Sequence, residues 1–92
     1  MTTQSLAKRI LIAEDETLIR MDLAEMLRES GYEVVGEATN GEEAINLAKE
    51  LKPDLAILDV KMPKIDGITA AESIVEISPV LVLTAFSQKG LD

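Results

Sequence analysis

Short apolar runs recur along this chain, and polar residues bound each of them. Three of the runs contain apolar residues only, and they are Ile10-Leu11-Ile12-Ala13, Leu55-Ala56-Ile57-Leu58 and Val80-Leu81-Val82-Leu83. Aliphatic runs of this length are typical of strands that other elements cover on both faces. The chain is therefore expected to fold around a buried parallel sheet, which requires a crossover, usually a helix, between successive strands.

Patterns of helical spacing lie between the runs. A stripe of apolar residues predicts a helix over residues 17–30 and is expected to face the core; it consists of Ile19, Leu23, Met26 and Leu27. A second helix is expected after Asn40, which precedes Glu43 by three residues as in a capping box, and it ends before Pro53. A third helix is expected over residues 68–76.

The expected order is strand-helix-strand-helix-strand-helix-strand, with strands near residues 9–13, 32–38, 55–58 and 80–84. The strand at 32–38 is less uniformly apolar than the others, so it is expected nearer an edge of the sheet. Short connections and right-handed crossovers then give an α/β fold, an open parallel sheet with helices on both faces. The chain has 92 residues, 47% of them hydrophobic, which is enough for one such domain over residues 1–92.

Charge and composition exclude several classes of function. Asp and Glu number 17 against 9 Lys and Arg, so direct binding of nucleic acid is not expected, whereas a cation such as Mg²⁺ is attracted. The absence of Cys and His excludes disulfides, thiol catalysis and every mechanism that uses a Ser-His or Cys-His pair. No stretch approaches the length of a transmembrane span, and a cytoplasmic location is expected.

Polar residues stand at the ends of three of the predicted strands. Glu14 and Asp15 follow the first strand, Asp59 follows the third and Thr84 ends the fourth. Each alone has an ordinary explanation as a helix cap, a loop residue or a strand former. Because the carboxyl ends of parallel strands share one edge of the sheet, where ligands bind, the coincidence predicts a functional site.

Clustered carboxylates repel one another unless a cation lies between them, and Mg²⁺ prefers such oxygen ligands. An ionised carboxylate at Asp59 is a competent nucleophile for phosphoryl transfer once the charge of the incoming group is neutralised. Thr84 offers a hydroxyl donor to a phosphate oxygen. These residues therefore favour phosphoryl chemistry that depends on Mg²⁺.

Together the motifs resemble the receiver domain of bacterial two-component response regulators. They are Ile10-Leu11-Ile12-Ala13-Glu14-Asp15-Glu16, then Pro53-Asp54-Leu55-Ala56-Ile57-Leu58-Asp59-Val60-Lys61-Met62-Pro63, then Asp66-Gly67, and Val80-Leu81-Val82-Leu83-Thr84-Ala85. The resemblance covers the chain from Lys8 and implies a flavodoxin/CheY-like fold. Single motifs are weak, and their combination is strong.

The resemblance implies a role for each matching residue. Asp59 is the phosphoacceptor, which receives its phosphoryl group from a histidine of a sensor histidine kinase. Asp15 is a direct Mg²⁺ ligand, Glu14 acts through water in place of the commoner Asp, and the backbone carbonyl of Lys61 is a further ligand. Thr84 is the switch hydroxyl. The domain is then a regulatory phosphoacceptor and not an enzyme in its own right.

The resemblance also implies that the chain is incomplete at its C-terminus. A full receiver continues through a fourth helix, a fifth strand that ends in a Lys, and a fifth helix, and the sequence stops at Asp92 before them. The fourth strand is then an open edge, and we expect the fold to be either marginal or closed on that side by a second copy in a homodimer. The runs around Ala13, Val60 and Leu83 look most like receivers attached to ANTAR-type RNA-binding antiterminator modules.

Two other interpretations remain open. The chain is a pseudo-receiver fragment that serves only protein interaction or dimerisation, or it is an aspartyl-phosphate hydrolase with a related sheet. Such hydrolases usually carry a second Asp two residues after the nucleophile, and Lys61 occupies that position. A flavin-binding flavodoxin is disfavoured, because no Ser-, Thr- and Gly-rich phosphate loop follows the first strand.

Overall fold

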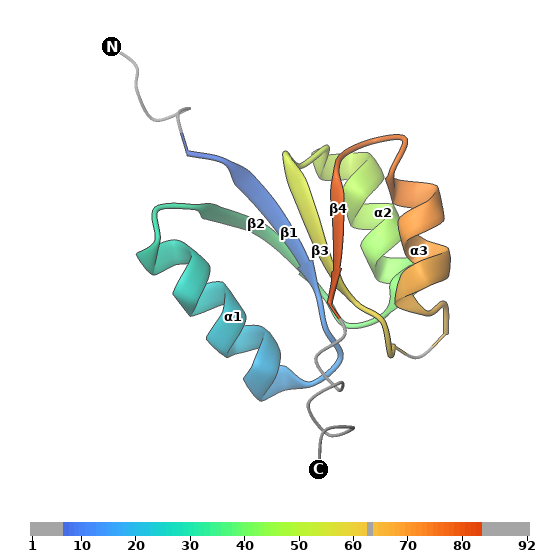
Figure 1. Cartoon of the computed structure of the whole chain (residues 1–92), viewed down its shortest axis with the longest axis horizontal. Coiled ribbons are helices and arrows are strands. Elements are labelled where there is room, and N and C mark those ends of the chain that lie inside the picture. The colour runs from blue at the N-terminus through green and yellow to red at the C-terminus, as the bar shows by residue number, and fades with distance from the viewer. Residues whose placement is uncertain (1–6, 63, 84–92) are drawn as a thin grey trace.

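The structure is a computed structural model that describes residues 7–62 and 64–83. Strands and helices alternate along these residues in the predicted order (Figure 1). They are β1 (Arg9–Ala13), α1 (Thr17–Glu29), β2 (Glu33–Ala38), α2 (Gly41–Leu51), β3 (Leu55–Asp59), α3 (Gly67–Ile74) and β4 (Val80–Leu83). The apolar runs form the strands, and the predicted α/β class is confirmed.

All strand pairs are parallel, and the order across the sheet is β2-β1-β3-β4. The less apolar β2 lies at an edge as predicted, and its ladder with β1 is irregular where Ile10 pairs with Val34 but Leu11 pairs with Gly36. The chain winds outward from β1 to β2 and then crosses back to β3 on the other side of β1. This reversal places the carboxyl ends of β1 and β3 side by side.

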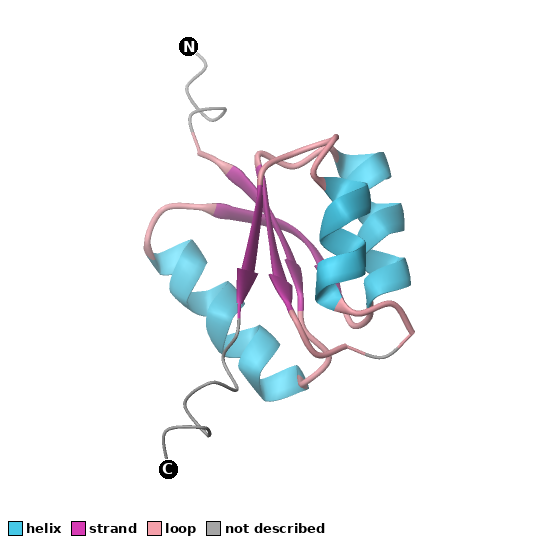
Figure 2. Ribbon diagram, turned by 45° about the vertical axis from the view of Figure 1, so that its right-hand side comes forward, coloured by secondary structure: helices cyan, strands magenta, loops and turns pink. Residues whose placement is uncertain are grey.

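The helices cover the two faces of the sheet unequally, with α1 on one face and α2 and α3 on the other (Figures 1 and 2). The two-helix face holds the larger core: Leu11, Ala13, Ala38, Ala44, Ala48, Ala56, Leu58, Met62, Ala70 and Ile74. The α1 face holds a smaller buried cluster of Ile10, Ile12, Ala24 and Ile57. Alternate residues of β1 thus serve opposite cores, so β1 is buried on both sides.

Several element boundaries differ from prediction by one or two residues, and at β3 the strand pairing decides the difference. Asp59 is the last residue of β3 and not the first residue of the loop, because it pairs with Leu83 and the next amide, Val60 N–H, donates to Leu83 O at 3.1 Å. The third helix spans Gly67–Ile74 and ends earlier than expected. The nucleophile candidate is therefore held in the sheet itself.

The predicted burial of the α1 stripe is largely wrong. Ile19 is 45% exposed and Met26 56% exposed, and Leu23 and Leu27 are only partly buried against the sheet. The reason is that α1 packs beside β1 and β2, and no second described helix joins it on that face. The predicted helical spacing is correct, but within residues 7–62 and 64–83 no element covers the whole apolar stripe of α1.

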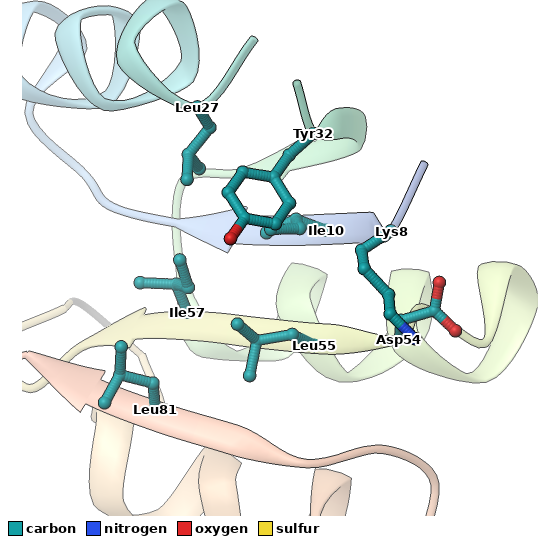
Figure 3. Close-up of a pocket in the computed structure, with 8 residues that line it drawn as sticks. All are labelled: Lys8, Ile10, Leu27, Tyr32, Asp54, Leu55, Ile57 and Leu81. Carbon is teal, nitrogen blue, oxygen red and sulfur yellow. The ribbon is translucent and has the colours of Figure 1, made fainter. Parts of the chain in front are cut away.

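An apolar groove of about 370 Å³ lies on the face of the sheet that α1 covers, beside the C-terminal end of α1 (Figure 3). Ile10, Leu55, Ile57 and Leu81 form its floor across three strands, Leu27 and Tyr32 form one wall, and Lys8 and Asp54 close one end. Leu81 on the edge strand β4 is 49% exposed. Among the described residues no strand pairs with the outer edge of β4, as predicted for this edge.

Candidate functional site

Three carboxylates from two strand ends meet at the reversal point of the sheet. The ligand atoms of Glu14, Asp15 and Asp59 all lie within 4.8 Å of one another. Glu14 and Asp59 are buried, at 5% and 9% exposure, whereas Asp15 is exposed to solvent. A set of three oxygen donors, open on one side, fits a hard divalent cation that keeps some of its water ligands. The predicted convergence is therefore present.

The buried position of Glu14 has an electrostatic consequence. Burial raises the pKa of the Glu14 carboxyl, and the nearby charge of Asp59 adds to this effect, while a hydrogen bond from Glu16 N–H opposes it. That hydrogen bond, to Oε2 at 3.0 Å, also fixes the direction of the carboxylate. Without a cation the ionised form of Glu14 is thus disfavoured, and a bound cation relieves this penalty.

The backbone of Glu14 is held from two sides. Its N–H donates to Ala38 O in the edge strand β2 at 3.0 Å, which extends the β1–β2 pairing beyond the end of β1. Its carbonyl oxygen accepts a hydrogen bond from Arg20 Nη1 at 2.8 Å. Arg20 Nε in turn donates to Glu37 Oε1 at 3.2 Å. The loop that carries the acidic pair is therefore tied to both β2 and α1.

The backbone around Asp59 is held just as closely on the other side. Gly67 N–H donates to Val60 O at 3.1 Å, and a Cβ atom at Gly67 would overlap the carbonyl oxygen of Asp59. Gly41, the first residue of α2, lies so close to Ile65 that a Cβ atom there would overlap the carbonyl oxygen of Ile65. The absence of a Cβ atom at the two glycines lets the starts of α2 and α3 pack closely against the end of β3 and the loop after it.

The remaining predicted site residues have different outcomes. Lys61 lies in the loop two residues after Asp59, and its side chain is exposed. Its backbone carbonyl as a metal ligand stays a prediction. Thr84 lies outside the described residues, although β4 ends at Leu83 beside Asp59, which brings the strand end to the predicted place.

Sequence reasoning missed the roles of Arg20 and Glu37, and it missed the close approach of Gly41 to Ile65. The helical pattern places Arg20 on the outer surface of α1, yet its side chain is only 13% exposed. One signal was available: Glu37 is a charged residue near the end of an otherwise mainly apolar strand, where a charge requires a partner. The identity of that partner depends on how α1 crosses β2.

The chain matches the family of the response regulator receiver domain over residues 10–91. It therefore belongs to this family, as the resemblance of its motifs implied. Receiver domains of this family are regulatory modules of two-component systems. The carboxylates of Glu14, Asp15 and Asp59 then form the acidic cluster at the sheet edge of such a domain.

Curated relatives agree with this assignment. The chain is 66% identical over 86 residues to the transcriptional regulatory protein PdtaR of Mycobacterium tuberculosis, covering 91% of this chain and 42% of PdtaR. It is 43% identical over 89 residues to the chemotaxis protein CheY of Thermotoga maritima, covering 94% of this chain and 74% of CheY. The chain thus spans well under half the length of PdtaR.

Solved structures share the fold. A chain from the CheX–CheY complex with BeF3 and Mg²⁺ from Borrelia burgdorferi superposes with a TM-score of 0.81 at 29% identity, covering 91% of this chain and 66% of that chain. The receiver domain of the response regulator NarL from Mycobacterium tuberculosis gives a TM-score of 0.78 at 30% identity, covering 92% and 76%. Among the described helices, none combines the length and the apolar character that a membrane span needs.

Proposed function

We propose that Asp59 is the phosphoacceptor of this receiver domain and takes a phosphoryl group from a phosphohistidine of a sensor histidine kinase. A carboxylate oxygen of Asp59 forms the new P–O bond, the P–N bond of the phosphohistidine breaks, and the imidazole nitrogen keeps the electron pair. The observation that carries the proposal is the convergence of Glu14, Asp15 and Asp59 within 4.8 Å. Family membership supports the class of reaction.

Glu14, Asp15, Asp59 and the backbone carbonyl of Lys61 are the proposed Mg²⁺ ligands, with Glu14 acting through water. When bound, the cation neutralises the incoming phosphoryl group and lets the carboxylates lie together. The protein's own contribution is to hold these oxygens in place, through the sheet at Asp59 and through the tied loop at Glu14. The similar Borrelia burgdorferi structure is a CheX–CheY complex with BeF3 and Mg²⁺, and this similarity supports such a site.

Thr84 is the proposed switch hydroxyl, which donates to a phosphate oxygen and so reports phosphorylation to the surface near β4. Its position directly after β4 supports this role, because the neighbouring Leu83 pairs with Asp59. The domain has no catalytic duty of its own beyond gaining and losing the phosphoryl group. The hydrolase alternative is disfavoured by Lys61, which stands where such enzymes usually carry a second Asp.

We propose that the phosphoryl signal passes to an output module of the ANTAR type. The identity of 66% with a transcriptional regulatory protein, of which this chain covers 42%, supports a further module with a regulatory role. The receiver itself, with a formal net charge of −8, is proposed to bind no nucleic acid directly. We also propose a cytoplasmic location for the chain.

We also propose a homodimer through the β4 side, where no described strand pairs with the outer edge. The same contact fits the interpretation in which the chain acts only as an interaction module. Leu81 is 49% exposed on β4, and it continues the apolar groove over β1 and β3. An unpaired strand edge beside exposed apolar side chains favours association with a second sheet. Dimerisation is compatible with phosphorylation, because the groove lies near the starts of the strands and Asp59 lies at an end.

Intact-mass spectrometry tests the phosphoacceptor directly. The chain is incubated with Mg²⁺ and a small phosphoryl donor such as phosphoramidate, and a mass gain of one phosphoryl group is expected that alkali removes. The Asp59→Asn variant should gain nothing, and Asp54→Asn, an exposed position before β3, should behave like the wild type. Equal labelling of the wild type and Asp59→Asn would refute the assignment of Asp59.

A further inference from the structure

We propose that Arg20 is a positioning residue for the metal centre. Its guanidinium fixes the peptide unit that joins Glu14 to Asp15, and Glu37 holds the guanidinium in that position. The inference rests on the proposed Mg²⁺ role of the carboxylates and adds the device that keeps two of them in place. Arg20 itself is assigned no contact with Mg²⁺ or with the reacting atoms.

The geometry of one peptide bond is the basis of this role. Arg20 Nη1 donates to the carbonyl oxygen of Glu14 at 2.8 Å. That oxygen lies in one plane with the amide nitrogen of Asp15 and with the Cα atoms of both residues, because the peptide bond is planar. A single hydrogen bond to this oxygen therefore restrains the backbone from which both carboxylates project.

The guanidinium is itself restrained. Nε donates to Glu37 Oε1 at 3.2 Å while Nη1 reaches Glu14, so two donors of one planar group point at partners on different elements. The Arg20 side chain is 13% exposed and that of Glu37 is 32% exposed, so both are partly shielded from water. A lysine ammonium carries the same charge but lacks this fixed fork, and it cannot reproduce both directions with one rigid group.

A neighbouring arginine provides a matched comparison. Arg28 Nη2 lies 3.6 Å from the other oxygen of Glu37, and its side chain is 56% exposed. Both arginines come from α1 and share one acidic partner, but the hydrogen bond to Glu14 O comes from Arg20. Changes at Arg28 therefore report what the ion pair with Glu37 contributes without the link to the metal loop.

Two simpler roles for Arg20 make different predictions. If Arg20 only anchors α1 to the sheet, its loss lowers the free energy of unfolding and leaves the Mg²⁺ affinity of the folded chain unchanged. If Arg20 acts only through its charge near the carboxylates, Arg20→Lys behaves like the wild type. A positioning role predicts that the conservative Arg20→Lys change weakens Mg²⁺ binding although the charge is kept.

The test is isothermal titration of the 92-residue chain with Mg²⁺, at a temperature where circular dichroism shows every variant to be folded. We expect Arg20→Lys to raise the Mg²⁺ dissociation constant about 10-fold, the usual scale for residues that orient metal ligands. Glu37→Ala should raise it similarly, and the double variant should be no weaker than the weaker single variant, because both act through one contact. Arg28→Lys should stay within about twofold.

Beryllofluoride binding adds a readout that a purely structural residue would not move. At saturating Mg²⁺, Arg20→Lys should bind beryllofluoride with the affinity of the wild type. Its affinity should be lower than that of the wild type only when Mg²⁺ is limiting. Unchanged Mg²⁺ affinity in both Arg20→Lys and Glu37→Ala would overturn the inference while the proposed function stands. No Mg²⁺ binding by the wild type would overturn both.

Discussion

Glu14 and Asp59 approach each other to within 4.8 Å at their carboxylate oxygens, although one follows β1 and the other ends β3. Replacing Glu14 by Gln removes a charge from this cluster and keeps an oxygen that can accept the Glu16 N–H. Without Mg²⁺, the free energy of unfolding should therefore rise by about 1 kcal/mol, the Coulomb energy of two unit charges about 4 Å apart in water. With Mg²⁺ the variant should be the less stable of the two, because a neutral side chain at position 14 attracts the cation less and the fold gains less from binding.

Urea denaturation with and without Mg²⁺ measures both effects of Glu14→Gln. Glu25→Gln, at an exposed position on α1, is the matched control and should change neither value appreciably. A Glu14→Gln variant that is less stable than the wild type in metal-free buffer would speak against repulsion in the cluster.

Gly67→Ala should destabilise the domain by about 2 kcal/mol, in the range for overpacking a rigid site. The added methyl group meets the backbone of Asp59 and Val60, which cannot move without shifting the candidate phosphoacceptor. Gly36→Ala is the matched control, because the atoms nearest to its methyl group are the flexible side-chain ends of Leu51, Leu11 and Leu47. Thermal unfolding should rank Gly67→Ala as the more damaging change, and equal melting temperatures would contradict this close approach.

The cap of α2 predicts a dependence on pH. Hydrogen bonds from Thr39, first from its backbone N–H, hold the pKa of the Glu43 carboxyl below its ordinary value of 4.5. Ionised Glu43 therefore stabilises the fold fully above pH 4.5, and this contribution is lost as the pH falls through the lower folded pKa. Glu43→Gln should lower the free energy of unfolding at pH 7 by about 0.5 kcal/mol.

The decisive measurement is how the difference in free energy of unfolding between the wild type and Glu43→Gln depends on pH. The wild-type and Glu43→Gln unfolding curves should converge in acid. Glu42→Gln is the matched control, because the ion pair that the structure describes for Glu42 is an exposed one with Lys64 at 3.6 Å, and its loss should change the stability at pH 7 by less. A difference between wild type and Glu43→Gln that persists unchanged at pH 3 would rule out the carboxylate as its cause.

The outer edge of β4, with which no described strand pairs, predicts self-association. Light scattering after size exclusion should show a dimer at micromolar concentration, and Leu81→Lys should shift it to monomer by placing a charge in the groove. Ile68→Lys removes an apolar side chain of similar exposure, 51%, from α3 on the opposite side of the sheet, and it should leave the dimer intact. A stable wild-type monomer at that concentration would refute the proposed dimer.

The core and the carboxylate cluster were predictable because they depend on local patterns. Apolar runs such as Ile10 to Ala13 identify strands buried on both faces. Because the strands are parallel, the acids at their carboxyl ends are expected to converge at one edge of the sheet. The exposure of Ile19 and Met26 was not predictable, because helical spacing gives the direction of a stripe and not the extent of what covers it.

The supporting contacts lie beyond local pattern. The link from Arg20 to Glu14 and Glu37 joins α1 with the loop after β1 and with β2, and the close approach of Gly41 to Ile65 joins the start of α2 with a distant loop. The capping box was anticipated only in part. Asn40 accepts from Glu43 N–H as expected, but the Glu43 carboxylate bonds the N–H of Thr39, one residue before the cap.

Beryllofluoride binding followed by fluorine NMR tests the central claim most directly. We predict a bound fluorine signal that appears with the wild-type chain only when Mg²⁺ is present, and that is absent from Asp59→Asn. Asp54→Asn, outside the carboxylate cluster, should give the wild-type signal. A bound signal that survives Asp59→Asn, or its absence from the wild type at saturating Mg²⁺, would contradict Asp59 as the phosphoacceptor.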